Sequence, residues 1–300
     1  MSRNLSIIGV AMELGQRRRG VAMGAEAIRD AGLLDRLENL HFNIRDLGDI
    51  YLPPRNTKEA DSTRSLRNLA EVVSMNERLA RKVAHEVATG YFPLVLGGDH
   101  SIAIGTIAGL SQHYENLGVI WIDAHGDMNT EETTPSGNIH GMPLAVSLGL
   151  GHERLTSIMK RKSKVKPENL VLIGIRDLDI GEKQLIKQLN IKTYTMHEVD
   201  RLGMDRIMKE TVAYLRDKTD GIHLSFDIDS LDPLEAPGVG TPVIGGLTFR
   251  ESRLALEILA EENVITSAEF VEVNPLLDKN NKTSEIVLHL IEALFGEKFI

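Results

Sequence analysis

The stretch GVIWIDAHGD, residues 118–127, ends a short apolar run with two aspartates and a histidine. An apolar run of this length is typical of a strand that helices cover on both faces. If the chain stays extended beyond Ile122, alternate side chains share one face. Asp123, His125 and Asp127 would then point to one spot at the carboxyl end of the strand, where open α/β sheets place their ligands.

Seven other short aliphatic runs repeat this pattern and alternate with amphipathic segments. The strands expected along the chain are 5–10, 42–47, 93–96, 118–123, 170–175, 192–196, 222–227 and 266–271. This order predicts one α/β domain over residues 1–300, with a parallel sheet of about eight strands and helices on both faces.

Two segments between the strands have apolar residues at helical spacing, 66–89 and 249–262. Thr248 is a candidate N-cap for the second, and Ser101 for a helix that follows His100. The polar segment 52–64, which contains two adjacent prolines, is expected to be a surface loop.

Two further clusters of ligand-type side chains end apolar runs: GGDH at 97–100 and SFDID at 225–229. With the first stretch they provide two imidazoles and four carboxylates, namely His100, His125, Asp123, Asp127, Asp227 and Asp229. Four carboxylates neutralise two divalent cations, and without cations they would repel one another and take up protons. The absence of thiolates argues against a structural zinc site, and the mixture of oxygen and nitrogen ligands favours Mn²⁺ over Mg²⁺.

Each cluster has an ordinary structural interpretation when it is taken alone. A single Asp-x-Asp pair at a strand end is typical of a cap or turn, and one histidine after Gly-Gly-Asp is a weak signal. Three clusters at the ends of three apolar runs favour a pair of metal ions instead. His140, in SGNIHG at 136–141, stays open between a packed core residue and a functional imidazole.

The composition excludes several classes of partner. The net charge of −9 and the absence of a basic stripe argue against nucleic acid and anionic membranes. No apolar run reaches the ~18–20 residues that span a bilayer. The chain has no cysteine, which rules out a disulfide framework, and its first residues have no signal-peptide layout. We therefore expect a soluble cytoplasmic protein.

The motifs together resemble the ureohydrolase family, and within it the bacterial-type arginases, over essentially the whole chain. The likeness begins at Gly15-Gln16, runs through the three clusters and ends at VEVNP, residues 271–275. The resemblance implies two Mn²⁺ per subunit and hydrolysis of the guanidino group of L-arginine to L-ornithine and urea. It implies that one ion is bound by His100, Asp123, Asp127 and Asp227. The other ion would be bound by Asp123, His125, Asp227 and Asp229. Asp123 and Asp227 would therefore bridge the two ions.

The resemblance also implies where an amino-acid substrate binds. The expected partners of the α-carboxylate are Asn129, Ser136 and Asn138, those of the α-ammonium are Asp177, Asp179 and Glu182, and Thr241 is a further candidate contact. Taken alone, the acidic segment 176–182 is more typical of a helix N-terminus. Ser230 stands where many arginases have glycine, so that motif does not separate arginases from their relatives.

A guanidinium is a poor electrophile because it is resonance-stabilised and keeps its proton near pH 7. Two metal ions roughly 3.5–4 Å apart can share a bridging water and supply hydroxide near neutral pH. Glu272 would hold the guanidinium over this nucleophile. Asp127 would accept the proton of the water, and His140 would deliver a proton to the departing amine.

Three alternatives remain at this point. The nearest is another ureohydrolase, which acts on agmatine or a guanidino acid and lacks the partners of the α-carboxylate. A two-metal phosphoesterase would need basic residues near the metals, and only Arg176 is close to a site motif. A metal-stabilised binding protein would leave His140 and Glu272 without a role. By resemblance, we expect the chain to self-associate as a homotrimer or homohexamer.

Overall fold

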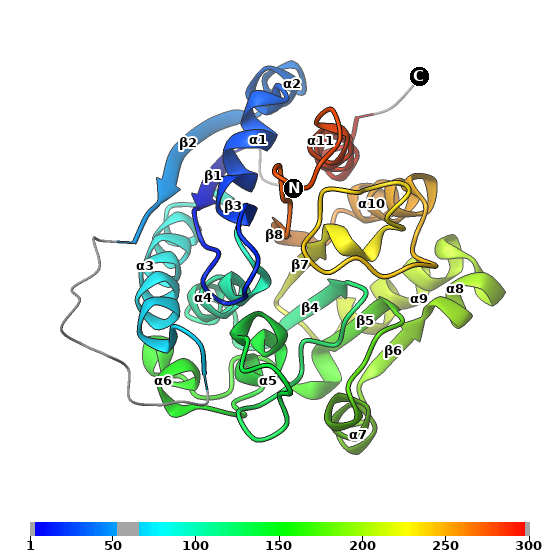
Figure 1. Cartoon of the computed structure of the whole chain (residues 1–300). Helices are drawn as coiled ribbons and strands as arrows, with labels where there is room; N and C mark the ends of the chain where they lie inside the picture. The colour runs from blue at the N-terminus through cyan, green and yellow to red at the C-terminus, as the bar shows by residue number, and fades with distance from the viewer. Residues whose placement is uncertain (1–3, 53–65, 298–300) are drawn as a thin grey trace.

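The computed structural model describes residues 4–52 and 66–297, which form a single α/β domain (Figure 1). One parallel sheet has the strand order β2-β1-β3-β8-β7-β4-β5-β6. The strands are β1 Asn4–Val10, β2 Asn43–Ile50, β3 Phe92–Leu96, β4 Leu117–Ile122, β5 Leu170–Ile175, β6 Lys192–Thr195, β7 Gly221–Asp227 and β8 Ile265–Val271. The predicted eight-stranded parallel sheet is confirmed.

Residues 53–64 of the expected surface loop lie outside the described residues.

The helices pack on both faces of the sheet, as predicted. They are α1 Gly24–Asp30, α2 Leu33–Asn39, α3 Leu69–Ala88, α4 Ala103–Leu110, α5 Pro143–Ser147, α6 Glu153–Thr156, α7 Ile180–Gln188, α8 Met196–Leu202, α9 Met204–Arg216, α10 Phe249–Glu262 and α11 Lys282–Leu294. Helices α1, α2 and α8 to α11 contribute to one hydrophobic cluster, and α3 to α7 contribute to the cluster on the other face.

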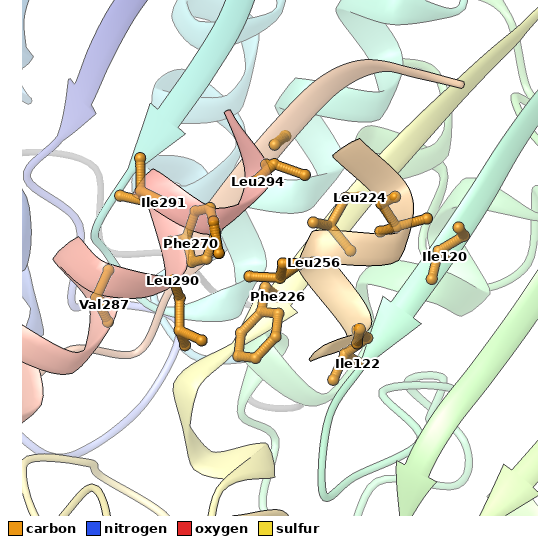
Figure 2. Packing of buried hydrophobic residues seen from close by; sticks show 14 of the residues in the cluster. Ile120, Ile122, Leu224, Phe226, Leu256, Phe270, Val287, Leu290, Ile291 and Leu294 are labelled. Carbon is orange, nitrogen blue, oxygen red and sulfur yellow. The ribbon is translucent and has the colours of Figure 1, made fainter. Parts of the chain in front are cut away.

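The central strands are buried along their whole length because each face supplies one of these clusters. In β4, Ile120 and Ile122 point into the first cluster, whereas Val119 and Trp121 point into the second. Figure 2 shows the first cluster, in which side chains of α10 and α11 pack on β4, β7 and β8. Burying each such side chain contributes roughly 1.5–3 kcal/mol, which makes these strands a rigid support for whatever follows them.

One of the two predicted helix caps is confirmed. The Thr248 side chain accepts a hydrogen bond from Glu251 N, and the Glu251 carboxylate accepts from Thr248 N in return. The expectation for Ser101 is wrong, because Asp99 caps this segment and accepts from Ser101 N. A 3-10 turn, His100–Ile102, then precedes α4. The carboxylate of Asp99 also accepts the Ser101 hydroxyl, so that hydroxyl is already engaged.

The condition that the chain stays extended past Ile122 is not met. Strand β4 ends at Ile122, and Asp127 has a left-handed backbone with φ 49°. Asp229 lies in a 3-10 turn, Ile228–Ser230, directly after β7. The physical reason is local: Asp123 accepts from His125 N, and Asp227 accepts from Asp229 N, and such side-chain bonds bend the chain into turns.

Within the two described ranges, no helix has the length and apolar character needed to cross a membrane. The expected cytoplasmic location stays a prediction.

A buried lysine provides a test of the packing on the α3 to α7 side. Lys164 is 1% exposed, and its ammonium donates to Thr156 O at 2.8 Å. Burial and the nearby Arg161 charge lower the pKa of Lys164 from 10.5 to about 8. Between these two pH values the unfolded chain binds the proton and the native chain does not, so stability rises with pH.

We expect Lys164→Met to remove this part of the pH dependence, which amounts to up to about 3 kcal/mol across the window. Urea unfolding of both proteins at several pH values between 8 and 10.5 measures it. The exposed Lys162→Met is the matched control and should keep the wild-type slope. An identical slope in Lys164→Met would mean that Lys164 is charged in the folded protein.

Candidate active site

The candidate site lies where β3, β4, β7 and β8 end, near the middle of the sheet (Figure 1). The segment after β3 passes close to α1, and a Cβ on Gly97 would lie 2.5 Å from Ala25 N. Gly97 also has φ 75°, so only glycine fits without strain. This close approach carries the next residues, Asp99 and His100, to the ends of the neighbouring strands.

His100 lies among three carboxylates. Its Nδ1 is 3.1 Å from Asp123 Oδ2, 3.1 Å from Asp127 Oδ2 and 3.0 Å from Asp227 Oδ2. All four side chains are buried, with His100 only 1% exposed. The imidazole stacks on Trp121 with ring centroids 4.0 Å apart, and Trp121 Nε1 donates to Asp123 Oδ2. These contacts fix both the ring plane and one carboxylate.

His125 lies beside a second set of carboxylates. Its Nδ1 is 3.4 Å from Asp123 Oδ1 and 3.2 Å from Asp229 Oδ2. The two oxygens of Asp123 therefore face different imidazoles, the arrangement that a bridging carboxylate needs. Asp227 presents Oδ2 to His100, while its Oδ1 accepts from Asp229 N.

These two groups fit a pair of divalent cations. Ligand atoms of His100, Asp123 and Asp227 lie within 4.8 Å of one another, and so do those of Asp123, His125 and Asp229. His100 Nδ1 is buried and has no hydrogen-bond partner, although three carboxylate oxygens surround it. Three carboxylate oxygens that converge on a buried imidazole nitrogen form the kind of ligand set that binds a divalent cation.

The electrostatics of the protein without cations support the same conclusion. Burial and the charge of Asp123 raise the pKa of Asp127 to about 6. Burial, followed by the charges of Asp229 and Asp123, raises the pKa of Asp227. Burial opposes protonation of His100, but the three carboxylates around it outweigh burial and raise its pKa. The raised pKa values mean that the cluster takes up protons to reduce its negative charge. Bound divalent cations would neutralise the same charge.

His140 and Glu272 form a pair beside these groups and belong to neither of them. His140 Nδ1 is 3.1 Å from Glu272 Oε1, and the same oxygen accepts from His100 N at 2.9 Å. Burial lowers the pKa of His140, but the Glu272 carboxylate outweighs it and raises this pKa to about 9. His140 is therefore a protonated imidazole paired with a buried carboxylate, and not the packed core residue that the sequence left open.

A pocket of about 130 Å³ joins the metal-type residues to the expected substrate residues. Its lining includes His125, Asp127, Asp227, His140, Thr241, Asn129, Ser136, Asn138, Asp179 and Glu182. Asn129 Nδ2 donates to Asp179 Oδ2 at 2.8 Å, which ties the two expected recognition segments together. Burial raises the pKa of Glu182 to about 7, although Met128 N and Asp179 N donate to its carboxylate.

The acidic segment is a helix N-terminus as well as part of the pocket, because Asp179 and Glu182 form the capping box of α7. Asp177 lies apart from the described pocket lining: its side chain is 64% exposed, and its Oδ2 is 4.0 Å from His125 Nε2. Arg176 donates to backbone carbonyls of residues 174, 229–231 and 243, so its guanidinium holds loops together. Thr241 Oγ1 donates to Asp229 Oδ2 at 2.8 Å.

Sequence reasoning missed a buried chain of hydrogen bonds beneath the site. His100 Nε2 lies 2.8 Å from Ser225 Oγ, which donates to Glu269 Oε1 at 2.8 Å. Burial opposes ionisation of Glu269, but the neighbouring His223 outweighs burial and lowers the pKa of this carboxyl. Glu269 therefore stays ionised. The available signal was the one charged residue of a largely buried strand, Glu269 in β8.

Comparison with known proteins agrees with this geometry. A model of the arginase family matches residues 3–296. An arginase from Bacillus caldovelox is 62% identical over 99% of both chains, and one from Bacillus subtilis is 56% identical over 100% of both chains. The chain belongs to the arginase family. The expectation that it is a hydrolase of the arginase type is thereby confirmed.

Solved structures of this family have the same fold. The Bacillus caldovelox arginase superimposes with a TM-score of 0.96, and each chain covers 99% of the other. An Entamoeba histolytica arginase in complex with L-ornithine has a TM-score of 0.90 at 37% identity, with 98% of this chain and 99% of that chain covered. A hypothetical agmatinase from Burkholderia thailandensis is 22% identical with a TM-score of 0.76, a likeness of fold alone.

The carboxylate cluster makes a prediction about metal binding. Asp227→Ala should lose most of its bound divalent metal, because it removes an expected ligand of both ions and leaves three carboxylates to neutralise two divalent cations. Metal analysis after dialysis measures this. Asp179→Asn is the matched control: it changes a pocket carboxylate outside both ligand groups and keeps a good helix cap. Full metal occupancy in Asp227→Ala would contradict the assignment.

Proposed function

We propose that this protein hydrolyses L-arginine to L-ornithine and urea, with two manganese ions bound by the carboxylate–imidazole cluster. The observation that carries the proposal is a single pocket whose lining combines three of the metal-type residues, His125, Asp127 and Asp227, with the partners expected for an α-amino acid. The identity to bacterial arginases of 62% and 56% supports the same activity.

Six side chains would hold the ions. His100, Asp123, Asp127 and Asp227 would bind one, and Asp123, His125, Asp227 and Asp229 the other. The two groups of converging ligand atoms support this division, and the resemblance to arginases implies that Asp227 also serves the second ion. Four carboxylates and two imidazoles without thiolates favour manganese. Two such ions, when bound, supply Lewis acidity and a water that ionises near neutral pH.

Glu272 would bind the guanidino group. Burial opposes its ionisation, but hydrogen bonds from His140 and from His100 N lower the pKa of Glu272, so it is a carboxylate at neutral pH. A buried carboxylate forms strong, planar hydrogen bonds with a guanidinium. Glu272 thus orients the carbon that is attacked and offsets the positive charge of the substrate.

Two side chains would move protons during the reaction. Asp127 lies in the pocket among the expected ligands, where its carboxylate can accept the proton that the attacking water loses. His140 holds its own proton with a pKa of about 9 and also lines the pocket. It can therefore deliver a proton to the amine nitrogen that leaves as ornithine.

The rim of the same pocket would recognise the amino-acid part of the substrate. Asn129, Ser136 and Asn138 carry hydrogen-bonding groups for the α-carboxylate, and Asp179 and Glu182 carry charge for the α-ammonium. Asp177 fits this role less well, because it lies beside His125 instead. Agmatine lacks the α-carboxylate, so an agmatinase would leave these three polar residues without a partner.

We also propose that the chain self-associates as a homotrimer or homohexamer. Large apolar side chains are exposed at Leu234 and Ile244, at 87% and 85%, and at Leu276. An interface would cover apolar side chains of this kind, and the trimer or hexamer itself is proposed from the resemblance to bacterial-type arginases. Light scattering coupled to size exclusion measures the mass, and a monomer at micromolar concentration would contradict the proposal.

The substrate assignment is tested by incubating manganese-loaded protein with L-arginine and, separately, with agmatine. We expect urea from L-arginine, and from agmatine a rate lower by at least about 10³-fold, since unpaired polar groups in a site strongly reject a substrate that lacks their partner. Comparable urea release from agmatine would keep the metal chemistry and overturn the recognition residues.

The proton-delivery role is tested with His140→Asn. We expect both metals to remain bound and kcat to fall by roughly 10²–10⁴-fold, the usual contribution of a general acid. His41→Asn is the control, because His41 is exposed and its left-handed backbone, φ 63°, also suits asparagine. If His140→Asn kept most of kcat, another group would deliver the proton.

A further inference from the structure

Gln16 lies in the loop between β1 and the 3-10 turn Val21–Met23, and it is only 6% exposed. Its Nε2 donates to Glu272 Oε2 at 2.8 Å, across 256 residues of sequence. The other oxygen of this carboxylate, Oε1, accepts from His100 N and lies against His140 Nδ1. Each oxygen of Glu272 therefore has its own fixed partner, and Oε2 is held by Gln16.

The loop itself is anchored to two segments of the site. Gly15 N donates to Asp99 Oδ2 at 2.8 Å, and His140 N donates to Gly15 O at 3.1 Å. Because Asp99 directly precedes His100, these bonds place the loop relative to the metal-type residues. On its other side, the Gln16 amide packs close to Gly240, where an added Cβ would lie 3.1 Å from Gln16 Oε1. The side chain has little room to move.

Glu272 needs such support because its own geometry does not fix it. Its backbone is left-handed, with φ 64°, a conformation that costs a non-glycine residue about 1–3 kcal/mol and persists only where surroundings impose it. A glutamate has three side-chain torsions, and the last of them is broad, so a carboxylate held at Oε1 alone can still tilt about that oxygen when the torsions change together. A second hydrogen bond, on Oε2, fixes the plane of the carboxylate.

We propose that Gln16 is a positioning residue for the guanidino group, which it serves by fixing the plane of the Glu272 carboxylate. The inference rests on the proposed function, in which that carboxylate binds the guanidinium. A guanidinium is planar and pairs with a carboxylate in one plane, whereas an ammonium is a compact charge without a preferred plane. A fixed plane therefore favours a guanidino group and sets where its carbon lies.

The test compares manganese-loaded Gln16→Met with wild type. Methionine has a similar length and no hydrogen-bond donor, so only the bond to Oε2 is lost. We expect kcat for L-arginine to fall about 10- to 100-fold, since small misplacements at a reacting centre have effects of this size. KM should change less than about threefold, because the Glu272 charge and the recognition residues remain. Arg17→Ala, an exposed neighbour in the loop, should match wild type.

Three further measurements separate positioning from a structural defect. Bound manganese and the inhibition constant of L-ornithine should stay at wild-type values in Gln16→Met, because Gln16 contacts none of the six expected ligands and ornithine has no planar guanidino group. Tm should fall by only a few degrees, the cost of one buried hydrogen bond. Loss of metal or a parallel loss of ornithine binding would overturn the inference, as would a kcat within twofold of wild type. A wild-type protein that releases no urea from L-arginine would instead overturn the proposed function.

Discussion

Repulsion among four buried carboxylates is the constraint on which the rest of this structure depends. Asp123, Asp127, Asp227 and Asp229 are between 0% and 6% exposed and lie around two imidazoles. Such a group is unstable unless cations or protons neutralise it. The buried strands on either side, the stacked Trp121 ring and the bonds to Ser225 and Glu269 hold the ligands in place regardless, so the site is preorganised.

The sheet and the ligand set could be predicted from the sequence because both are local patterns. Apolar runs define β4, β5 and β7 to within about a residue, and each ligand cluster follows such a run directly. Parallel strands end at one edge of a sheet, which brings separate clusters together without any knowledge of the loops. Turns follow β4 and β7 in place of extended segments. The expected ligand residues still lie together, but the backbone brings them there through turns.

Contacts across long stretches of sequence could not be predicted. Gln16 and Glu272 are 256 residues apart, and neither the polar loop before α1 nor the VEVNP motif indicates that they touch. The left-handed backbones of Asp127 and Glu272 likewise have no local signal, because neither residue is glycine and the tertiary structure imposes both. Asp177 and Asp179 are only two residues apart in the sequence, which predicts a shared role. In the structure the Asp177 side chain lies near His125 instead.

In the proposed function, one cluster of carboxylates and imidazoles binds two ions close together. Low-temperature electron paramagnetic resonance of the protein, titrated with manganese to two equivalents per chain, tests it directly. Ions roughly 3.5–4 Å apart, the spacing of two-metal sites, couple magnetically. We expect a spin-coupled spectrum that reaches its maximum at two equivalents. The hyperfine pattern of isolated manganese at that stoichiometry, or saturation at one equivalent, would contradict it.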